Sequence, residues 1–206
     1  MKDLTGALPG RLRMASMLAL LLTGVCGMLS AWEGFSLARF AELRQASARL
    51  PPDPALTDQL RASHILALEQ MREPRMLVLF ALALSCSLTF VASTRLLRPA
   101  GLPREGVRRI LVWALVVAAA LRTIDGAQST VVARRAAEML RRGLRLPPGI
   151  EGAAAEQLRG VLTPATFMAG AILQTALVAG TFIALSQYFR SARVREWVER
   201  EDARSS

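Results

Sequence analysis

Residues 76–93 read MLVLFALALSCSLTFVAS, a stretch of 18 residues without a charged side chain. Apolar residues also dominate three other stretches, Met14–Ala31, Ile110–Val131 and Phe167–Phe189. A helix needs about 20 residues to cross a hydrocarbon core about 30 Å thick. The four stretches therefore predict an all-α integral membrane protein with four transmembrane helices.

The charged residues lie mostly between these stretches. They make up 20% of the chain, and the formal net charge is +10. Clustered positive charge is typical of nucleic-acid binding, but arginines beside membrane helices are also attracted to anionic lipid headgroups, by about 1 kcal/mol each. With four predicted spans, we interpret the excess charge as contact with the lipid bilayer and expect no nucleic-acid partner.

The placement of the arginines predicts the orientation of the chain. Five of them lie in the short link of about 94–109 between the second and third stretches. The connections of about 32–75 and 132–166 are much longer and mix arginines with acidic residues. Because the positive-inside rule gives most weight to short loops, we expect a multi-pass protein of the cell membrane with both termini in the cytoplasm. The long loops are then extracytoplasmic, and the tail of about 190–206 is a cytoplasmic amphipathic helix.

A repeated motif indicates that the chain, 1–206, is a single membrane domain built from two similar halves. Arg49-Leu50-Pro51-Pro52 recurs as Arg145-Leu146-Pro147-Pro148. The predicted pseudo-repeats run over about 13–98 and about 109–195, and each forms a helical hairpin. No proline occurs between the first span of each repeat and its Pro-Pro pair, so we expect that span to continue as a helix outside the bilayer until the prolines end it. The fold class is therefore two tandem hairpins with helical extracytoplasmic extensions.

The amino-terminal stretch also resembles a secretory signal, because Lys2, Arg11 and Arg13 precede its apolar run. Cleavage near Ser30 or Ala31 stays open as an alternative. We expect retention, because the run is long and a helical pattern follows it.

The cysteines Cys26 and Cys86 both lie inside apolar stretches. Counted from the predicted span ends, they lie at different depths, so we expect free thiols that pack as small apolar groups. We expect neither a metal site nor a cofactor.

The third span carries a candidate intramembrane polar site. Its uninterrupted apolar part, Ile110–Leu121, is too short to cross a bilayer, so a full span includes Arg122 and Asp125. These residues share a helix face at i and i+3 and can pair. Gln174 and Thr175 of the fourth span are expected at nearly the same depth as Arg122. Ionisable groups inside a membrane are functional candidates, although an exit of the span at Leu121 would place the pair at the outer interface.

Small residues recur at four-residue spacing and form candidate helix-packing faces. One series is Thr23, Gly27 and Ala31 in the first span, and another is Ala176, Gly180 and Ala184 in the fourth. Such faces allow helix backbones to approach closely. We expect packing within the monomer in preference to a dedicated dimer interface.

The sequence contains no phosphate-binding glycine loop, nucleophile elbow or zinc-protease motif. We therefore expect no enzyme, but a structural or assembly component that contacts other membrane subunits, either a different protein or further copies of itself. A small channel, transporter or transporter subunit with a polar site at Arg122, Asp125 and Gln174 is the alternative. A sensor with an extracytoplasmic helical crown is the third possibility.

Overall fold

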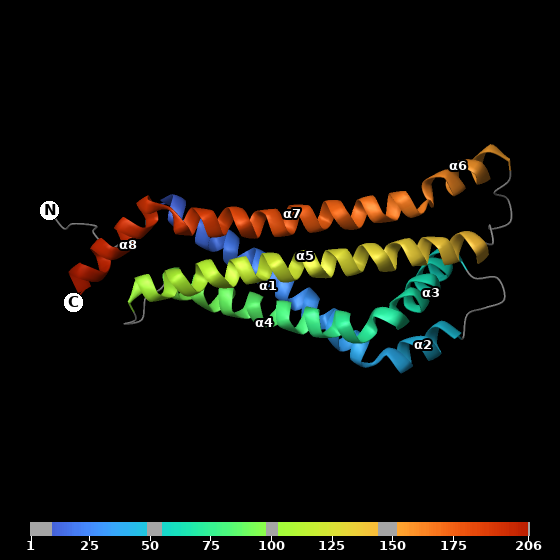
Figure 1. Ribbon diagram of the computed structural model, residues 1–206, viewed down its shortest axis with the longest axis horizontal. Coiled ribbons are helices and arrows are strands. Elements are labelled where there is room, and N and C mark those ends of the chain that lie inside the picture. The colour runs from blue at the N-terminus through green and yellow to red at the C-terminus, as the bar shows by residue number, and fades with distance from the viewer. Residues whose placement is uncertain (1–9, 49–54, 98–102, 144–151, 206) are drawn as a thin grey trace. The chain divides into compact units, whose positions relative to one another are not determined.

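The computed structural model describes residues 10–48, 55–97, 103–143 and 152–205. Nearly every residue in these ranges is helical, and none of them lies in a strand. The helices, labelled in Figure 1, are α1 (Gly10–Ala38), α2 (Phe40–Ala48), α3 (Leu56–Leu68), the short 3-10 helix η1 (Glu69–Met71), α4 (Arg72–Leu97), α5 (Arg104–Gly143), α6 (Ala153–Val161), α7 (Pro164–Arg190) and α8 (Ala192–Ser205).

Four helical segments are long and apolar enough to cross a membrane: Gly10–Ala38, Leu56–Leu97, Arg104–Gly143 and Pro164–Arg190. They contain the four predicted stretches, so the all-helical class with four candidate spans is confirmed. Many of their large apolar side chains point outward, among them Leu77, Trp113 and Leu177. Lipid would cover such side chains without an energetic penalty. The hairpin arrangement stays a prediction.

The helices contribute to two compact units. Unit 1 comprises residues 1–31, 80–122 and 178–206, and unit 2 comprises residues 32–79 and 123–177. Each unit takes residues from both predicted repeats. The duplication itself stays a prediction, because the Pro-Pro pairs lie outside the described residues.

The core of unit 1 combines large buried side chains with hydrogen bonds between helices. Leu82 of α4, Leu115 of α5 and Phe182 of α7 are fully buried. The Ser85 hydroxyl donates to the Ala114 carbonyl at 3.0 Å, and the Ser186 hydroxyl donates to the Val112 carbonyl at 3.3 Å. Hydrogen bonds of this kind stabilise helix pairs where water is absent.

The carboxyl-terminal helix α8 packs on unit 1, where Val194 and Val198 are buried in the core. Its Asp202 carboxylate accepts hydrogen bonds from the backbone N–H groups of Arg104 and Glu105, at 2.9 and 3.0 Å. These N–H groups belong to the first turn of α5 and have no partner within that helix. Asp202 therefore acts as an N-cap supplied by a different helix. The predicted amphipathic tail is a helix whose apolar side is buried against the protein.

Two contacts of Arg104 extend this junction between α5 and α8. Its guanidinium forms an ion pair with Glu201 at 3.3 Å, and it lies 5.4 Å from the centre of the Trp197 ring.

Glu105, outside the apolar stretch of α5, accepts hydrogen bonds from Arg108 and Arg109. The pKa of Glu105 is lowered from about 4.5 to about 2, mainly by the hydrogen bond from Arg108. Partial burial acts in the opposite direction and raises this pKa, whereas the hydrogen bond from Arg109 lowers it further.

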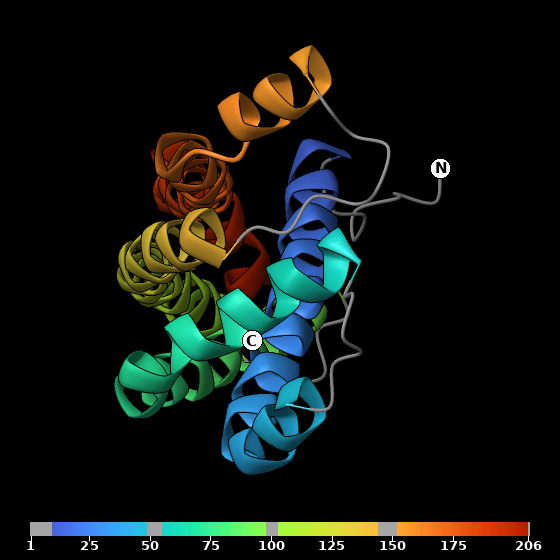
Figure 2. The same ribbon diagram turned by 90° about the vertical axis from the view of Figure 1, so that its right-hand side faces the viewer.

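Unit 2 has a separate core made by α1, α3, α4 and α5. Its buried members are Leu37 and Phe40 near the α1–α2 junction, Ile65, Ala67 and Leu68 of α3, Leu79 of α4, and Val132 and Ala136 of α5. Figure 2 shows α3 lying beside α5 in this unit. The packing gives the predicted extracytoplasmic extension around Val132 and Ala136 an apolar partner.

One expected extension is not continuous. We expected the first span to run as one helix to Leu50, but α1 ends at Ala38 and α2 begins at Phe40. Arg72 explains the break, because its Nε donates to the Leu37 carbonyl at 3.0 Å and its Nη2 donates to the Ala38 carbonyl at 3.2 Å. These bonds satisfy carbonyls that a helix end leaves without partners. The matching extension of α5 continues to Gly143 without interruption.

Candidate functional site

A buried arginine organises the polar groups of unit 2. Arg75, in the first turn of α4, donates from Nε and Nη2 to the same Glu33 oxygen, Oε1, at 3.0 and 2.6 Å. Its Nη1 donates to the Ser129 hydroxyl at 2.9 Å. Its Nη2 also lies 3.4 Å from Asp125 Oδ1. All three guanidinium nitrogens are therefore engaged by α1 and α5, and we call Glu33, Arg75, Asp125 and Ser129 the Arg75 cluster.

The members of the Arg75 cluster differ in burial. The side chain of Asp125 is 0% exposed and that of Arg75 is 7% exposed, whereas that of Glu33 is 38% exposed. Removal of one partner from a buried ion pair costs about 3–5 kcal/mol, because the other charge stays buried without compensation. The cluster therefore supports the helices of unit 2.

The Arg75 cluster borders an open pocket of about 760 Å³. Small residues from two helices, Ala133 and Ala136 of α5 and Gly170 and Ala171 of α7, leave room for it. Most of the remaining surface is apolar. The complete lining is Glu33, Leu60, Ser63, His64, Arg75, Ser129, Ala133, Ala136, Val161, Leu162, Thr166, Phe167, Gly170, Ala171 and Gln174. Its volume lies in the range of about 300–1,000 Å³ that is usual for small-molecule sites.

Two further polar side chains line the pocket besides the Arg75 cluster. His64 lies on α3, outside the apolar stretch 76–93. The pKa of His64 lies below its usual 6.5, mainly because the side chain is desolvated. The positive charge of Arg75 lowers this pKa further, whereas the negative charge of Glu33 raises it. Both effects of the surroundings that lower this pKa favour the neutral imidazole. Gln174 is exposed on α7 and makes no hydrogen bond to any described residue.

The structure places the four predicted polar-site residues in different surroundings. Arg122 is half-buried on the part of α5 that belongs to unit 1. Asp125 is buried, with the ion pair to Arg75 described above. Gln174 faces the pocket. The hydroxyl of Thr175 donates to the Ala171 carbonyl of its own helix at 2.8 Å, and Thr175 packs so tightly on Gly126 that a Cβ there would overlap it.

The sequence reasoning missed Glu33 and Arg75. Each lies at one end of a predicted long loop, immediately beside an apolar stretch, and each was counted only among the loop charges. A charged residue directly at the end of an apolar stretch is a usable signal, because it lies where it can bond with intramembrane polar groups of other helices. Applied here, that signal points to both residues.

The two predicted helix-packing faces also differ. In unit 1, Thr23 is buried, and an added Cβ at Gly27 would lie 2.9 Å from the Cβ of Cys86. The series on α1 therefore packs closely on α4. The members of the series on α7, Ala176, Gly180 and Ala184, are all exposed, and no atom lies within 4 Å of a Cβ added at Gly180.

Cys26 and Cys86 are free thiols, as expected. Cys26 packs against the core of unit 1 that contains Cys86. The close approach of α1 to α4 occurs at Gly27, beside Cys86.

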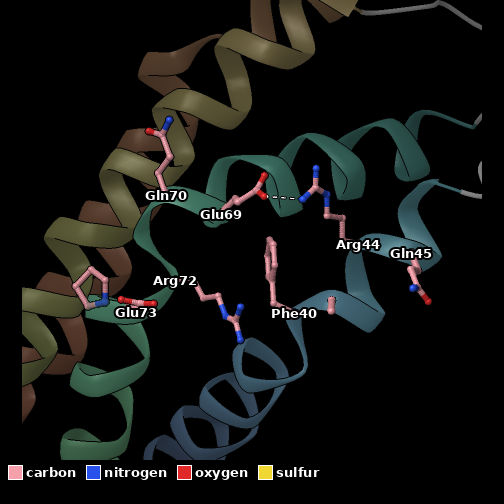
Figure 3. Close-up of a pocket in the computed structure, with 9 residues that line it drawn as sticks. Phe40, Arg44, Gln45, Glu69, Gln70, Arg72 and Glu73 are labelled. Atoms are coloured by element: carbon pink, nitrogen blue, oxygen red, sulfur yellow. Dashed lines mark hydrogen bonds and ion pairs between the residues drawn. The ribbon is translucent and has the colours of Figure 1, made fainter.

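Unit 2 also has a smaller pocket, of about 610 Å³, shown in Figure 3. Arg44 and Glu69 point toward one another there, with an ion pair of 2.8 Å, and the Arg72 guanidinium lies 5.7 Å from the centre of the Phe40 ring. The side chains of Arg44 and Glu69 are 61% and 43% exposed, so their charges interact through solvent. This pocket offers weaker electrostatic recognition than the one at the Arg75 cluster.

A comparison with models of known protein families, with characterised proteins and with solved structures found no match to this chain.

Proposed function

We propose that this chain is a non-catalytic, multi-pass protein of the cell membrane that acts through helix contacts with other membrane subunits. The observation that supports the proposal is the open face of α7, formed by Ala176, Gly180 and Ala184. In this proposal both termini are cytoplasmic, as the arginine distribution predicts.

The contrast with α1 supports the role of this face. The series at Gly27 packs on α4 within unit 1, and it leaves no room for a side chain. Gly180 belongs to a series with the same four-residue spacing, but a side chain added there would meet nothing. Small residues lower the distance at which a second helix can pack, and membrane helices associate largely through such packing. A helix of another subunit is the occupant that suits this face.

The test compares two glycines of the same helix. Gly180→Leu places a bulky side chain on the α7 face, whereas Gly170→Leu places the same side chain outside it. Neither added Cβ meets another atom, and leucine favours a helix more than glycine does, by roughly 1 kcal/mol, so both variants should fold.

Each variant is produced together with a second copy of the same variant that carries a different tag. The first copy is purified in mild detergent, and the proteins that co-purify with it are identified by mass spectrometry. We expect Gly180→Leu to lose a membrane partner that the wild type and Gly170→Leu retain. Loss of the second tagged copy would identify that partner as the chain itself. The proposal is wrong if Gly180→Leu retains every partner of the wild type.

A further inference from the structure

We propose that unit 1 binds anionic phospholipid at the end where α1 begins, α4 ends and α7 is followed by α8. The proposal shares with the proposed function only the premise that the chain spans a membrane, and it concerns different residues. The binding surface consists of five exposed arginines, which we call the arginine rim: Arg11, Arg13, Arg95, Arg190 and Arg193.

The arginine rim surrounds one end of the core of unit 1. Each of its members is the direct neighbour in sequence of a buried core residue. Within unit 1, the start of α1, the end of α4 and the α7–α8 junction lie at the same end (Figure 1). The arginines therefore point away from a shared core and form one positively charged surface. The buried neighbours are Leu12, Leu96, Phe189 and Val194.

The acidic residues of unit 1 do not balance this charge. The described part of unit 1 contains twelve arginines and five acidic residues, whereas that of unit 2 contains ten and eight. Glu105, Glu196, Glu199 and Glu201 form ion pairs with arginines outside the rim, and Asp202 caps α5. The arginine rim forms no hydrogen bond or ion pair with any described residue. Its guanidinium groups are therefore available to an anion from outside the protein.

Exposed apolar side chains beside the arginines indicate a lipid and not a free anion. Met14, Met17 and Val91 each lie three or four positions from an arginine of the rim, on the same helix face. Their exposed fractions are 72%, 47% and 54%. A phospholipid has its phosphate and its acyl chains in the same order, so each part meets matching surface. A free phosphate would contact the arginines alone.

The charge of the arginine rim selects anionic over zwitterionic lipid. A guanidinium binds phosphate oxygens through two parallel hydrogen bonds. A choline headgroup brings its own cation close to the arginines, which reduces the attraction, whereas a glycerol headgroup does not. The orientation that we propose places this end in the cytoplasm, where anionic lipids give the membrane surface a negative potential.

The test measures lipid binding to the intact chain in a non-ionic detergent by native mass spectrometry. The probes are phosphatidylglycerol and phosphatidylcholine with identical acyl chains, and glycerol phosphate without any chain. We expect saturable binding of phosphatidylglycerol, much weaker binding of phosphatidylcholine, and no binding of glycerol phosphate in the same concentration range.

Two double variants assign the binding to the arginine rim. Each arginine at a membrane surface contributes about fivefold to the attraction of anionic lipid. Arg190→Gln combined with Arg193→Gln should therefore weaken phosphatidylglycerol binding by roughly 10–30-fold. Arg11→Gln combined with Arg13→Gln should have an effect of similar size, so the test does not depend on one variant. None of these side chains bonds to a described residue, so both double variants should fold.

Two controls separate the arginine rim from the total charge and from the helix contact. Arg141→Gln combined with Arg142→Gln removes the same charge from exposed residues of unit 2, and it should bind phosphatidylglycerol as the wild type does. Gly180→Leu, which tests the helix contact, should also leave lipid binding unchanged. Failure of one proposal is therefore distinguishable from failure of the other.

Any of three results would overturn the proposal. The first is equal affinity of the wild type for phosphatidylglycerol and phosphatidylcholine, including no binding of either. The second is binding of glycerol phosphate as tight as that of phosphatidylglycerol. The third is a loss of phosphatidylglycerol binding that is no larger in the two rim variants than in the control variant of unit 2.

Discussion

Replacement of Asp202 by alanine tests whether α8 is held to unit 1 by capping the first turn of α5. The carboxylate accepts two backbone N–H groups, those of Arg104 and Glu105, at 2.9 and 3.0 Å. Loss of an N-cap side chain costs about 0.5–2 kcal/mol, and loss of a negative charge at a helix amino terminus costs about 0.3–1 kcal/mol. Because the two effects overlap, we expect Asp202→Ala to weaken the attachment of α8 by about 1–2 kcal/mol.

Hydrogen exchange of the backbone amides of α8 measures this change directly. A loss of about 1–2 kcal/mol raises the population of the released helix roughly 5–30-fold, and amides protected by attachment should exchange faster by that factor. Glu196→Ala is the matched control, because Glu196 lies on the same helix and its carboxylate pairs with the exposed Arg200, at 3.4 Å. Asp202→Asn keeps a carbonyl acceptor and should show a smaller effect. Equal exchange rates in Asp202→Ala and Glu196→Ala would refute the capping argument.

Two further predictions concern ionic groups in each unit. Arg75→Leu should destabilise the protein by about 3–5 kcal/mol, because it removes a buried guanidinium that bonds to Glu33, Ser129 and Asp125. Arg44→Leu, at an exposed ion pair, should cost about 0–1 kcal/mol. Similar unfolding temperatures for the two variants in detergent would contradict the assigned burial. The lowered pKa of Glu105 stabilises the folded state above pH 4.5, and this contribution is lost as the pH falls toward 2. Acid titration followed by circular dichroism should therefore show less loss of stability between pH 4.5 and 2 in Glu105→Gln than in the wild type, and identical titration curves would disprove the linkage.

Local sequence was sufficient to predict the long helices. The charge-free stretch 76–93 lies within α4, and the stretch 167–189 lies within α7, which begins at Pro164. Thr163 caps the start of α7, because its hydroxyl accepts a hydrogen bond from the Thr166 N–H at 3.3 Å. Apolar runs and a local cap such as that of Thr163 depend on residues a few positions apart, so a short window of sequence contains this signal.

The Arg75 cluster depends on residues that are far apart in the sequence. Arg75 binds Glu33 at a separation of 42 residues and Ser129 at a separation of 54. Local reasoning placed Asp125 beside Arg122 on one helix face, and it had no means of identifying a partner on α4. The cap from Asp202 was missed for the same reason, since its N–H donors lie 98 and 97 residues away. Only the packing of helices brings such groups together.

The small-residue faces show the limit of spacing as a signal. A four-residue period places Thr23 and Gly27 on one side of α1, and Ala176 and Gly180 on one side of α7, with equal reliability. Which neighbour lies against that side is decided by the other helices: Gly27 meets Cys86 of α4, and Gly180 meets no described atom. The same substitution should therefore have different consequences. A leucine at Gly27 must displace α4, whereas a leucine at Gly180 should leave the fold unchanged and block only the helix contact that we propose for this face.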